Sequence, residues 1–370
     1  MVLAHFKNAE IKAIVSIVPE KEISLDDELQ YYNNDINKVN RIKKQIGINK
    51  RRVVNKDTTT ADLGFYAVKK LLEDTKTKVE NIDAIIFVCQ YPDYINPGNS
   101  SLIHGWLNFP TKCLAFDINQ GCAGYTYGIY LAYSLISAGG CKNIVLITAE
   151  TPSKYIDINN RSIAPILADA ASASLISNCE NNPSYFSINA DGSGFNNIIL
   201  PSGGGRIPIN NETLNQLKNK DIFMNGLEVF NFTLSQVPKD IINLMKYANK
   251  TAQDFDYLVL HQANKQIMQN IALQSGFSKE QTLINALESY ANTASCSIPI
   301  AINFDLSSNS ANANLILCGY GIGLSWASCI VHLNSVYLSK IYNYQKTPKP
   351  YSISLNSTKE AIDYFNNLIN

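Results

Sequence analysis

The sequence lacks several features that mark common classes of protein. No hydrophobic run approaches the roughly 20 residues that a helix needs to cross a bilayer, and the charged N-terminal stretch does not resemble a secretory signal. The 31 basic residues balance 31 acidic ones, so no overall field attracts nucleic acid or an anionic membrane. We therefore expect a cytoplasmic globular protein with no membrane span and no nucleic-acid partner.

The cysteines show no CxxC pair, although the chain contains eight of them. They are dispersed, and most lie in apolar, strand-like segments where free thiols are commonly buried. This distribution argues against both a disulfide framework and a zinc site. We expect reduced cysteines and no bound metal.

The stretch from residue 116 to residue 138 contains the first candidate for chemistry. An apolar strand is predicted over residues 113–118, followed by Asn-Gln-Gly, Cys122 and a run of small and apolar residues at helical spacing. This pattern places Cys122 on a turn between a strand and a buried helix, at the N-terminus of that helix. Backbone N–H groups and the helix dipole favour a thiolate there, so Cys122 is a candidate nucleophile.

Strands and helices alternate along the rest of the chain. Strands are predicted over residues 10–19, 84–89, 143–148 and 257–260, and helical patterns occupy much of the sequence between them. Residues 41–52 form a basic segment, which favours a solvated loop or a surface for a phosphate or an acidic carrier. The alternation indicates an α/β fold with a largely parallel sheet.

Two parts of the chain repeat the same plan, which indicates an internal duplication. Asn-Ile-Asp83 and Asp-Phe-Asp256 each lead into a short apolar strand, and loops of small residues at 168–171 and 319–323 each lead into another. Asn, Gly, Ser and Pro gather near residues 180–220, where we place the join. We therefore predict halves over residues 1–180 and 181–334, and a C-terminal extension over residues 335–370 that ends in a helix.

Histidine is scarce, so each of the four can be considered. His5, His104 and His332 have the surroundings of structural residues, whereas His261 ends a buried strand and opens a helix. The C-terminal ends of parallel strands are where α/β proteins collect their active groups. Cys122 and His261 would each occupy such a position, one in each half.

Asn292 is a third candidate, in a loop of small polar residues that precedes a helix rich in Ala and Ile. Its amide offers two hydrogen-bond donors. The alternative is that Asn292 simply caps the following helix.

The segments around Cys122, His261 and Asn292, together with the glycine loop GYGIGLSW, resemble the four signatures of β-ketoacyl-acyl carrier protein synthase III, of the thiolase superfamily. They occur in the order and at about the spacing of that family, and residues 223–230 match a further family segment. The resemblance runs from roughly residue 10 to residue 334. It implies a five-layered αβαβα fold of two similar halves, usually in a homodimer.

The resemblance also implies roles for these residues. Cys122 would accept an acyl group as a thioester, and His261 and Asn292 would donate hydrogen bonds to a malonyl thioester as it decarboxylates. The resulting carbanion would attack the acyl-cysteine. Backbone N–H groups of Cys122 and of the glycine loop would hold the oxyanion, which implicates Gly321, Ile322 and Gly323.

Residues at the entrance depart from the family pattern. Arg41 and Gln45 stand where the family commonly has Trp and Arg, whereas Arg161 matches an Arg associated with the adenine end of coenzyme A. The substrate-binding or carrier-binding residues implied by the resemblance are Arg41, Arg161, Asn264, Lys265 and Gln266. We expect coenzyme A or acyl carrier protein thioesters as substrates and no tightly bound cofactor. Because the entrance is altered, we do not expect coenzyme A thioesters or the housekeeping carrier protein to be preferred.

In the family, a loop of the partner subunit closes the acyl pocket, and the matching place here is around residues 91–99. Tyr94, Ile95 and Asn96 would line the pocket there or, equally, form dimer contacts. Two further functions stay open at this point. The enzyme could pass the acyl group from Cys122 to an oxygen or nitrogen nucleophile without decarboxylation. Alternatively, the chain could be a non-catalytic partner subunit of a condensing enzyme.

Overall fold

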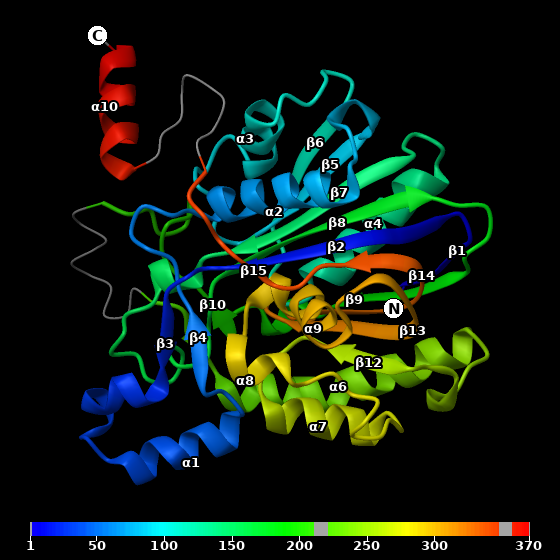
Figure 1. Cartoon of the computed structure of the whole chain (residues 1–370). Helices are drawn as coiled ribbons and strands as arrows, with labels where there is room; N and C mark the ends of the chain where they lie inside the picture. The colour runs from blue at the N-terminus through cyan, green and yellow to red at the C-terminus, as the bar shows by residue number, and fades with distance from the viewer. Residues whose placement is uncertain (1, 211–220, 348–356, 370) are drawn as a thin grey trace.

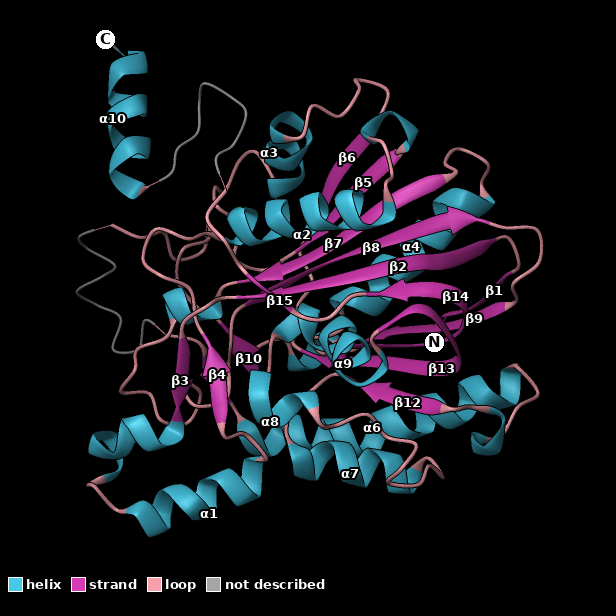
Figure 2. Ribbon diagram, viewed as in Figure 1, coloured by secondary structure: helices cyan, strands magenta, loops and turns pink. Residues whose placement is uncertain are grey.

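The protein folds into five layers, in which helices and two sheets alternate (Figure 1). The structure is a computed structural model, and it describes residues 2–210, 221–347 and 357–369. The five-layered αβαβα arrangement expected from the resemblance is confirmed. Figure 2 shows the strands crossing the middle of the molecule with helices above, between and below them.

The first sheet has the strand order β2-β8-β7-β5-β6. Its strands are β2 (Ala9–Val18), β8 (Ala170–Asn178), β7 (Asn143–Glu150), β5 (Ala84–Val88) and β6 (Leu114–Ile118). Helices α2 (Thr60–Thr75) and α3 (Asn99–Trp106) cover its outer face. Strand β5 runs parallel to both β6 and β7, so residues that follow these three strands gather at one edge.

The second sheet has the order β1-β9-β14-β13-β12. Its strands are β1 (Val2–Phe6), β9 (Ser184–Ala190), β14 (Ser325–Leu338), β13 (Ser308–Gly321) and β12 (Tyr257–Leu260). Helices α6 (Gly226–Tyr247) and α7 (Lys265–Gln274) pack on its outer side. The two sheets join where the end of β14 pairs with β2.

Two helices fill the layer between the sheets. Helices α4 (Gly124–Ser137) and α9 (Ser297–Leu306) contact strands of both sheets. Helix α4 carries no charged residue, and the small Gly128 lets it approach Leu146 of β7 closely. A helix covered on both sides needs such an apolar surface all round.

The expectation of a largely parallel sheet is wrong in part. Strand β8 is antiparallel to β2 and β7, and β14 is antiparallel to β9 and β13. The pairing of β13 with β14 in a long hairpin follows from their short turn, which joins neighbouring strands directly. The tip of that hairpin is the glycine loop.

Smaller elements surround the two sheets. A projecting unit consists of a 3₁₀ segment (Leu25–Tyr32) and α1 (Ile36–Ile46), next to the hairpin of β3 (Glu22–Ser24) and β4 (Lys50–Arg52). Leu25, Tyr32 and Val39 form its small core. The remaining elements are η2 (Val79–Asn81), η3 (Pro152–Tyr155), η4 (Gly192–Gly194), β10 (Ile198–Ile199), β11 (Phe223–Met224), η5 (Ala252–Asp254), α8 (Ala286–Tyr290) and η6 (Ala294–Cys296).

The C-terminal segment folds back onto the first sheet. Strand β14 continues past the predicted boundary at residue 334, and β15 (Tyr342–Asn343) then pairs with β2. The hydroxyls of Tyr337 and Tyr342 both donate to Asp74 of α2. A final helix, α10 (Thr358–Ile369), confirms the predicted terminal helix. The division into halves at residue 180 and an extension from residue 335 stays a prediction, and residues 211–220 of the predicted join lie outside the described residues.

Candidate active site

Cys122 lies in the turn that joins β6 to α4, as the sequence predicts. The turn is tight, with the N–H of Gly124 donating to the carbonyl of Gly121 at 2.7 Å. A side chain on Gly121 would collide with the side chains of Gln90 and Ile322. The lack of a side chain at Gly121 therefore lets three segments meet beside the cysteine.

The glycine loop between β13 and β14 packs directly against Cys122. A Cβ atom on Gly321 would lie 2.7 Å from the Cβ of Cys122 and 2.8 Å from its sulfur. Gly321 also has a φ of +153°, which favours glycine. The next residue, Ile322, directs its backbone N–H at the Cys122 sulfur. The two backbone segments implied as the oxyanion site thus lie side by side.

The Cys122 thiol is protonated at rest. Burial raises its pKa to about 11, and the N–H groups of Ile322 and Cys122 itself only partly oppose that effect. Burial therefore outweighs the bias toward thiolate that is expected at the helix N-terminus. Removal from water destabilises the thiolate by more free energy than the helix N-terminus and the two N–H groups contribute to its stabilisation.

His261 follows β12 and is almost fully buried. Its backbone N–H donates to the carbonyl of Cys318 at 2.8 Å, and its carbonyl accepts from the hydroxyl of Tyr320 at 3.0 Å. Its Nδ1 lies 2.7 Å from the hydroxyl oxygen of Ser297 at the start of α9. Burial lowers the pKa of His261 to about 3, so the imidazole is neutral at any physiological pH.

Asn292 lies in a constrained loop between α8 and η6. Its backbone bridges to Leu167, and its Oδ1 accepts from the N–H of Ala294 at 2.9 Å. The neighbouring alanines, Ala291 and Ala294, have φ values of 55° and 48°, which are uncommon for residues with a side chain. The capping alternative stays open, because Ala294 begins the 3₁₀ segment η6, which runs directly into α9 at Ser297.

The three candidate residues belong to one connected region. Cys122 contacts the glycine loop, whose Tyr320 packs edge-on against the ring of His261. The carbonyl of Ala294 faces the same imidazole, and Ala294 is held by the side chain of Asn292. The arrangement therefore offers a sulfur nucleophile next to backbone donors, a neutral imidazole and an amide.

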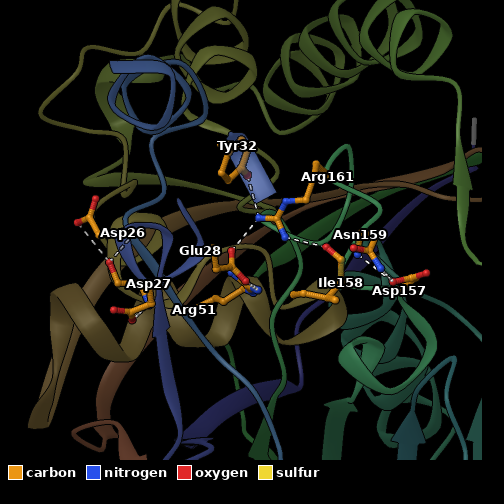
Figure 3. Close-up of polar contacts among 10 residues, drawn as sticks. Asp26, Asp27, Glu28, Tyr32, Arg51, Asp157, Ile158, Asn159 and Arg161 are labelled. Atoms are coloured by element: carbon orange, nitrogen blue, oxygen red, sulfur yellow. Dashed lines mark hydrogen bonds and ion pairs between the residues drawn. The ribbon is translucent and has the colours of Figure 1, made fainter. Parts of the chain in front are cut away.

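Arg161 lies away from this region, in a network of polar contacts at the projecting unit (Figure 3). It donates to Glu28 at 2.7 Å and to the hydroxyl of Tyr32 at 2.8 Å. A third bond, also 2.8 Å long, goes to the carbonyl of Ile158. Arg51 binds the same carboxylate with both terminal nitrogens. Burial of Glu28 opposes ionisation, but the two guanidinium groups outweigh it and lower the pKa of Glu28.

The aromatic rings of Tyr31 and Tyr32 lie within 5.0 Å and 4.7 Å of the Arg161 guanidinium carbon. Its two terminal nitrogens and the aromatic rings beside it therefore form contacts inside the protein, whereas its Nε has no hydrogen-bond partner among the described residues. The expectation that Arg161 receives the adenine end of coenzyme A stays a prediction. In this structure the side chain forms hydrogen bonds within the protein.

The other entrance candidates lie on α1 and α7, which contact each other. Arg41 is exposed on α1, and Lys265 and Gln266 are exposed in the first turn of α7. Asn264 has a structural role as the N-cap of α7, since its Oδ1 accepts from the N–H of Ile267 at 2.8 Å.

Tyr94, Ile95 and Asn96 lie in the loop between β5 and α3. Ile95 is 82% exposed, and Asn96 is also exposed. The ring of Tyr94 packs against Phe365 of α10 at a centroid distance of 6.0 Å. No contact with the Cys122 region is recorded for these three residues within the described chain, so their assignment to an acyl pocket stays a prediction.

Sequence reasoning missed several residues that shape the site. Ser297 and Tyr320 hold His261, and Glu28 holds Arg161. Glu150, at the end of β7, is buried beside the loop of Asn292. The rule that selected His261 would have found Glu150, because it also ends a buried strand. The described residues contain no cluster of His, Cys, Asp or Glu that could hold a metal ion and no helix able to span a membrane.

Comparison with known proteins places this site in a family. Residues 116–193 match the family model of 3-oxoacyl-[acyl-carrier-protein] synthase III, and residues 245–333 match the model of its C-terminal part. A β-ketoacyl-[acyl-carrier-protein] synthase III of Halalkalibacterium halodurans is 34% identical over 330 residues, covering 88% of this chain and 97% of that protein. The chain belongs to the 3-oxoacyl-[acyl-carrier-protein] synthase III family.

Other members of the synthase III family agree. One from Fusobacterium nucleatum is 33% identical over 294 residues, which is 78% of this chain and 89% of that protein. The crystal structure of a 3-oxoacyl-(acyl-carrier protein) synthase from Burkholderia xenovorans superposes with a TM-score of 0.87 at 32% identity, covering 93% of this chain and 99% of that one. The family membership predicted from four motifs is thus confirmed. The family is one of condensing enzymes.

Proposed function

We propose that this enzyme holds an acyl group on Cys122 and extends it by decarboxylative condensation with a malonyl thioester. The observation that carries the proposal is the combination of a sulfur beside two backbone donors with a neutral His261 and the amide of Asn292. Neutral donors suit an enolate, because they stabilise the charge that develops without binding the ground-state carboxylate too tightly.

In the first half-reaction, the Cys122 sulfur attacks the carbonyl carbon of an acyl thioester. A new carbon–sulfur bond forms, the bond to the donor sulfur breaks, and the donor leaves as a thiol with the proton that Cys122 loses. The N–H groups of Cys122 and Ile322, which interact with the resting sulfur, would donate to the carbonyl oxygen as it becomes negative. The high pKa of Cys122 means that its proton leaves only as attack proceeds.

In the second half-reaction, the bond between the malonyl carboxylate and the α-carbon breaks and carbon dioxide leaves. The electron pair enters an enolate, whose oxygen accepts hydrogen bonds from His261 and Asn292. The α-carbon then attacks the acyl-cysteine carbonyl, and the Cys122 sulfur leaves and regains a proton. We propose that the Ser297 hydroxyl, 2.7 Å from Nδ1 of His261, holds the imidazole ring in the orientation that the substrate needs.

For the thioester donor, we propose acyl carrier protein rather than free coenzyme A. The contacts of Arg161 support this choice, because they engage both terminal nitrogens of its guanidinium inside the protein and place two tyrosine rings close to it. The exposed cations Arg41, Lys44 and Lys265 on α1 and α7 provide a surface for an acidic carrier. No tightly bound cofactor is needed for either half-reaction.

We also propose a homodimer in which the loop with Tyr94, Ile95 and Asn96 lines the acyl pocket of the partner. The high exposure of Ile95 supports this arrangement, because a large apolar side chain at a loop tip gains most from a covering surface. Sedimentation at several protein concentrations would test the dimer.

The experiment that tests the function is incubation with acyl and malonyl thioesters, each offered on coenzyme A and on acyl carrier protein. We expect release of carbon dioxide and the acyl mass on the peptide that contains Cys122. Cys122→Ala should abolish both, and Cys179→Ala, at the other partly exposed cysteine, should change neither. An acyl group on another residue, or none with any donor, would contradict the proposal.

A further inference from the structure

Glu150 ends strand β7 and is completely buried. Its Oε2 accepts from the backbone N–H of Gln90 at 3.1 Å, and its Oε1 accepts from the hydroxyl of Ser295 at 2.9 Å. Within the described part of the chain, no Lys, Arg or His pairs with it. A buried carboxyl without a cation is costly to ionise, so its presence here calls for an explanation.

The two partners of Glu150 belong to the two sides of the site. Gln90 follows β5, and its side chain packs against Gly121, the residue before Cys122. Ser295 stands between Asn292, which carries the amide, and Ser297, which holds His261. Glu150 therefore connects the turn of the nucleophile to the loop of the hydrogen-bond donors through one side chain.

The surroundings of Glu150 disfavour negative charge. Burial raises its pKa to about 8, which outweighs the hydrogen bonds from Gln90 and Ser295. Five titratable groups of the described residues interact with it, and each becomes negative on losing its proton: Cys89 and Tyr91 after β5, Cys122 before α4, Asp169 before β8, and Cys296 in η6. A charge on Glu150 would thus oppose a charge on the Cys122 sulfur.

We propose that Glu150 is a positioning residue that binds the Cys122 and Asn292 loops together and must be uncharged for the Cys122 sulfur to become negative. It keeps its own proton throughout and touches neither substrate nor the reacting atoms. The role in condensation rests on the proposed function, whereas the effect on Cys122 reactivity does not.

The first test follows alkylation of Cys122 by iodoacetamide from pH 6.5 to 9.5, read by mass spectrometry of its peptide. In Glu150→Gln the rate should rise about tenfold per pH unit, as expected of a thiol below its pKa, whereas in the wild type ionisation of Glu150 should flatten the rise around pH 8. The alkylation rate of Glu150→Gln divided by that of the wild type should increase at least about threefold between pH 6.5 and pH 9.

The matched control is Asp240→Asn, at another buried carboxyl whose partners are Ser187, Asn189 and Ser328. Burial also raises the pKa of Asp240. Unlike Glu150, however, Asp240 does not contribute to the pKa shift of Cys122. Its profile should match the wild type. Identical profiles for wild type and Glu150→Gln, or the same change in Asp240→Asn, would overturn the proposal.

The second test compares condensation by Glu150→Gln and Glu150→Ala at pH 7. The glutamine can keep one link and should retain kcat within about threefold, whereas alanine breaks both links and should lower kcat at least about tenfold with KM little changed. Equal kcat in the two variants would overturn the positioning role. If the wild type condensed nothing while the alkylation profiles differed as expected, the proposed function would fail and the effect of Glu150 on Cys122 would stand.

Discussion

The hydroxyl oxygen of Ser297 lies 2.7 Å from Nδ1 of His261, at the junction between the start of α9 and the end of β12. Two elements from different parts of the second half thus orient one imidazole. A second bond, from Tyr320 to the His261 carbonyl, fixes the backbone of the same residue. Ring and backbone are held independently, which makes each contact testable by itself.

Removal of the Ser297 hydroxyl should impair the condensation step. In Ser297→Ala, the imidazole loses the contact that orients its ring, so we expect kcat to fall about tenfold while KM changes little. Steady-state kinetics of carbon dioxide release would measure this. Ser278→Ala removes a hydroxyl that contacts Gln281 and Glu280 in an exposed turn, and it should leave kcat unchanged. Equal effects of the two substitutions would contradict the orienting role.

A methyl group on Gly321 should disrupt the nucleophile. Gly321→Ala places a Cβ within 3 Å of the Cys122 side chain and strains a backbone with a φ of +153°. We expect a loss of kcat/KM of about a hundredfold, because a shift of about 1 Å in a reacting group costs that much. Gly192→Ala is the control, since nothing lies within 4 Å of its added Cβ. Acylation of Cys122 at the wild-type rate in Gly321→Ala would show that the contact is unimportant.

Asn292→Ala should separate the two half-reactions. Cys122 should still take up the acyl group, but decarboxylation should slow by about a hundredfold or more because one enolate donor is lost. Mass spectrometry would show the acyl-enzyme accumulating while carbon dioxide release falls. Asn81→Ala, at an exposed position, should affect neither. If product formation survived Asn292→Ala, simple transfer of the acyl group to another nucleophile would become the better description.

His261 should make the fold sensitive to acid. Its pKa falls from 6.5 in the unfolded chain to about 3 in the folded protein, so between these values only the unfolded state binds the proton. Stability should therefore decrease as pH falls through this window, by about 1.4 kcal/mol per pH unit for this residue alone. Denaturant unfolding at pH 7 and pH 5 should show a smaller loss in His261→Gln. An equal loss in both proteins would mean that His261 is protonated in the folded state.

Loss of the Glu28 charge should destabilise the projecting unit. Glu28→Gln leaves the guanidinium groups of Arg51 and Arg161 without their shared anion, at a cost of about 3 kcal/mol. Glu22→Gln, which breaks exposed pairs with Lys50 and Arg52, should cost less than about 1 kcal/mol. Urea denaturation measures both free energies. A similar loss of unfolding free energy in the two variants would show that the buried network stabilises the protein no more than the exposed ion pairs do.

Local patterns predicted much of the site, because its candidate catalytic residues follow strands or sit in loops of small residues. Cys122 and His261 were found from the apolar strand before each of them. Glu150 and Ser297 were not, since their importance depends on which loops meet in space. The helix N-terminus that favours a thiolate at Cys122 is visible in the sequence, whereas the removal of the sulfur from water that opposes it is not.

Strand directions were also beyond local patterns. A buried strand has the same apolar composition in parallel and antiparallel pairs, so β8 and β14 could not be distinguished from β5 and β7. The contacts of Arg161 depend likewise on the distant Glu28, whose position in a 3₁₀ segment gives no signal of burial. Contacts between residues that are far apart in sequence can be identified only from the folded structure.

Strand β2 has a bearing on how the chain is made. It spans residues 9 to 18, yet one of its neighbours is β8 and the other is formed by the end of β14 and by β15, more than 300 residues later. During synthesis, the first sheet can assemble as far as β8 while one edge of β2 stays unpaired. That edge is closed only when residues 337–343 have left the ribosome. The pairing of β2 is thus completed only after more than 300 further residues have been translated.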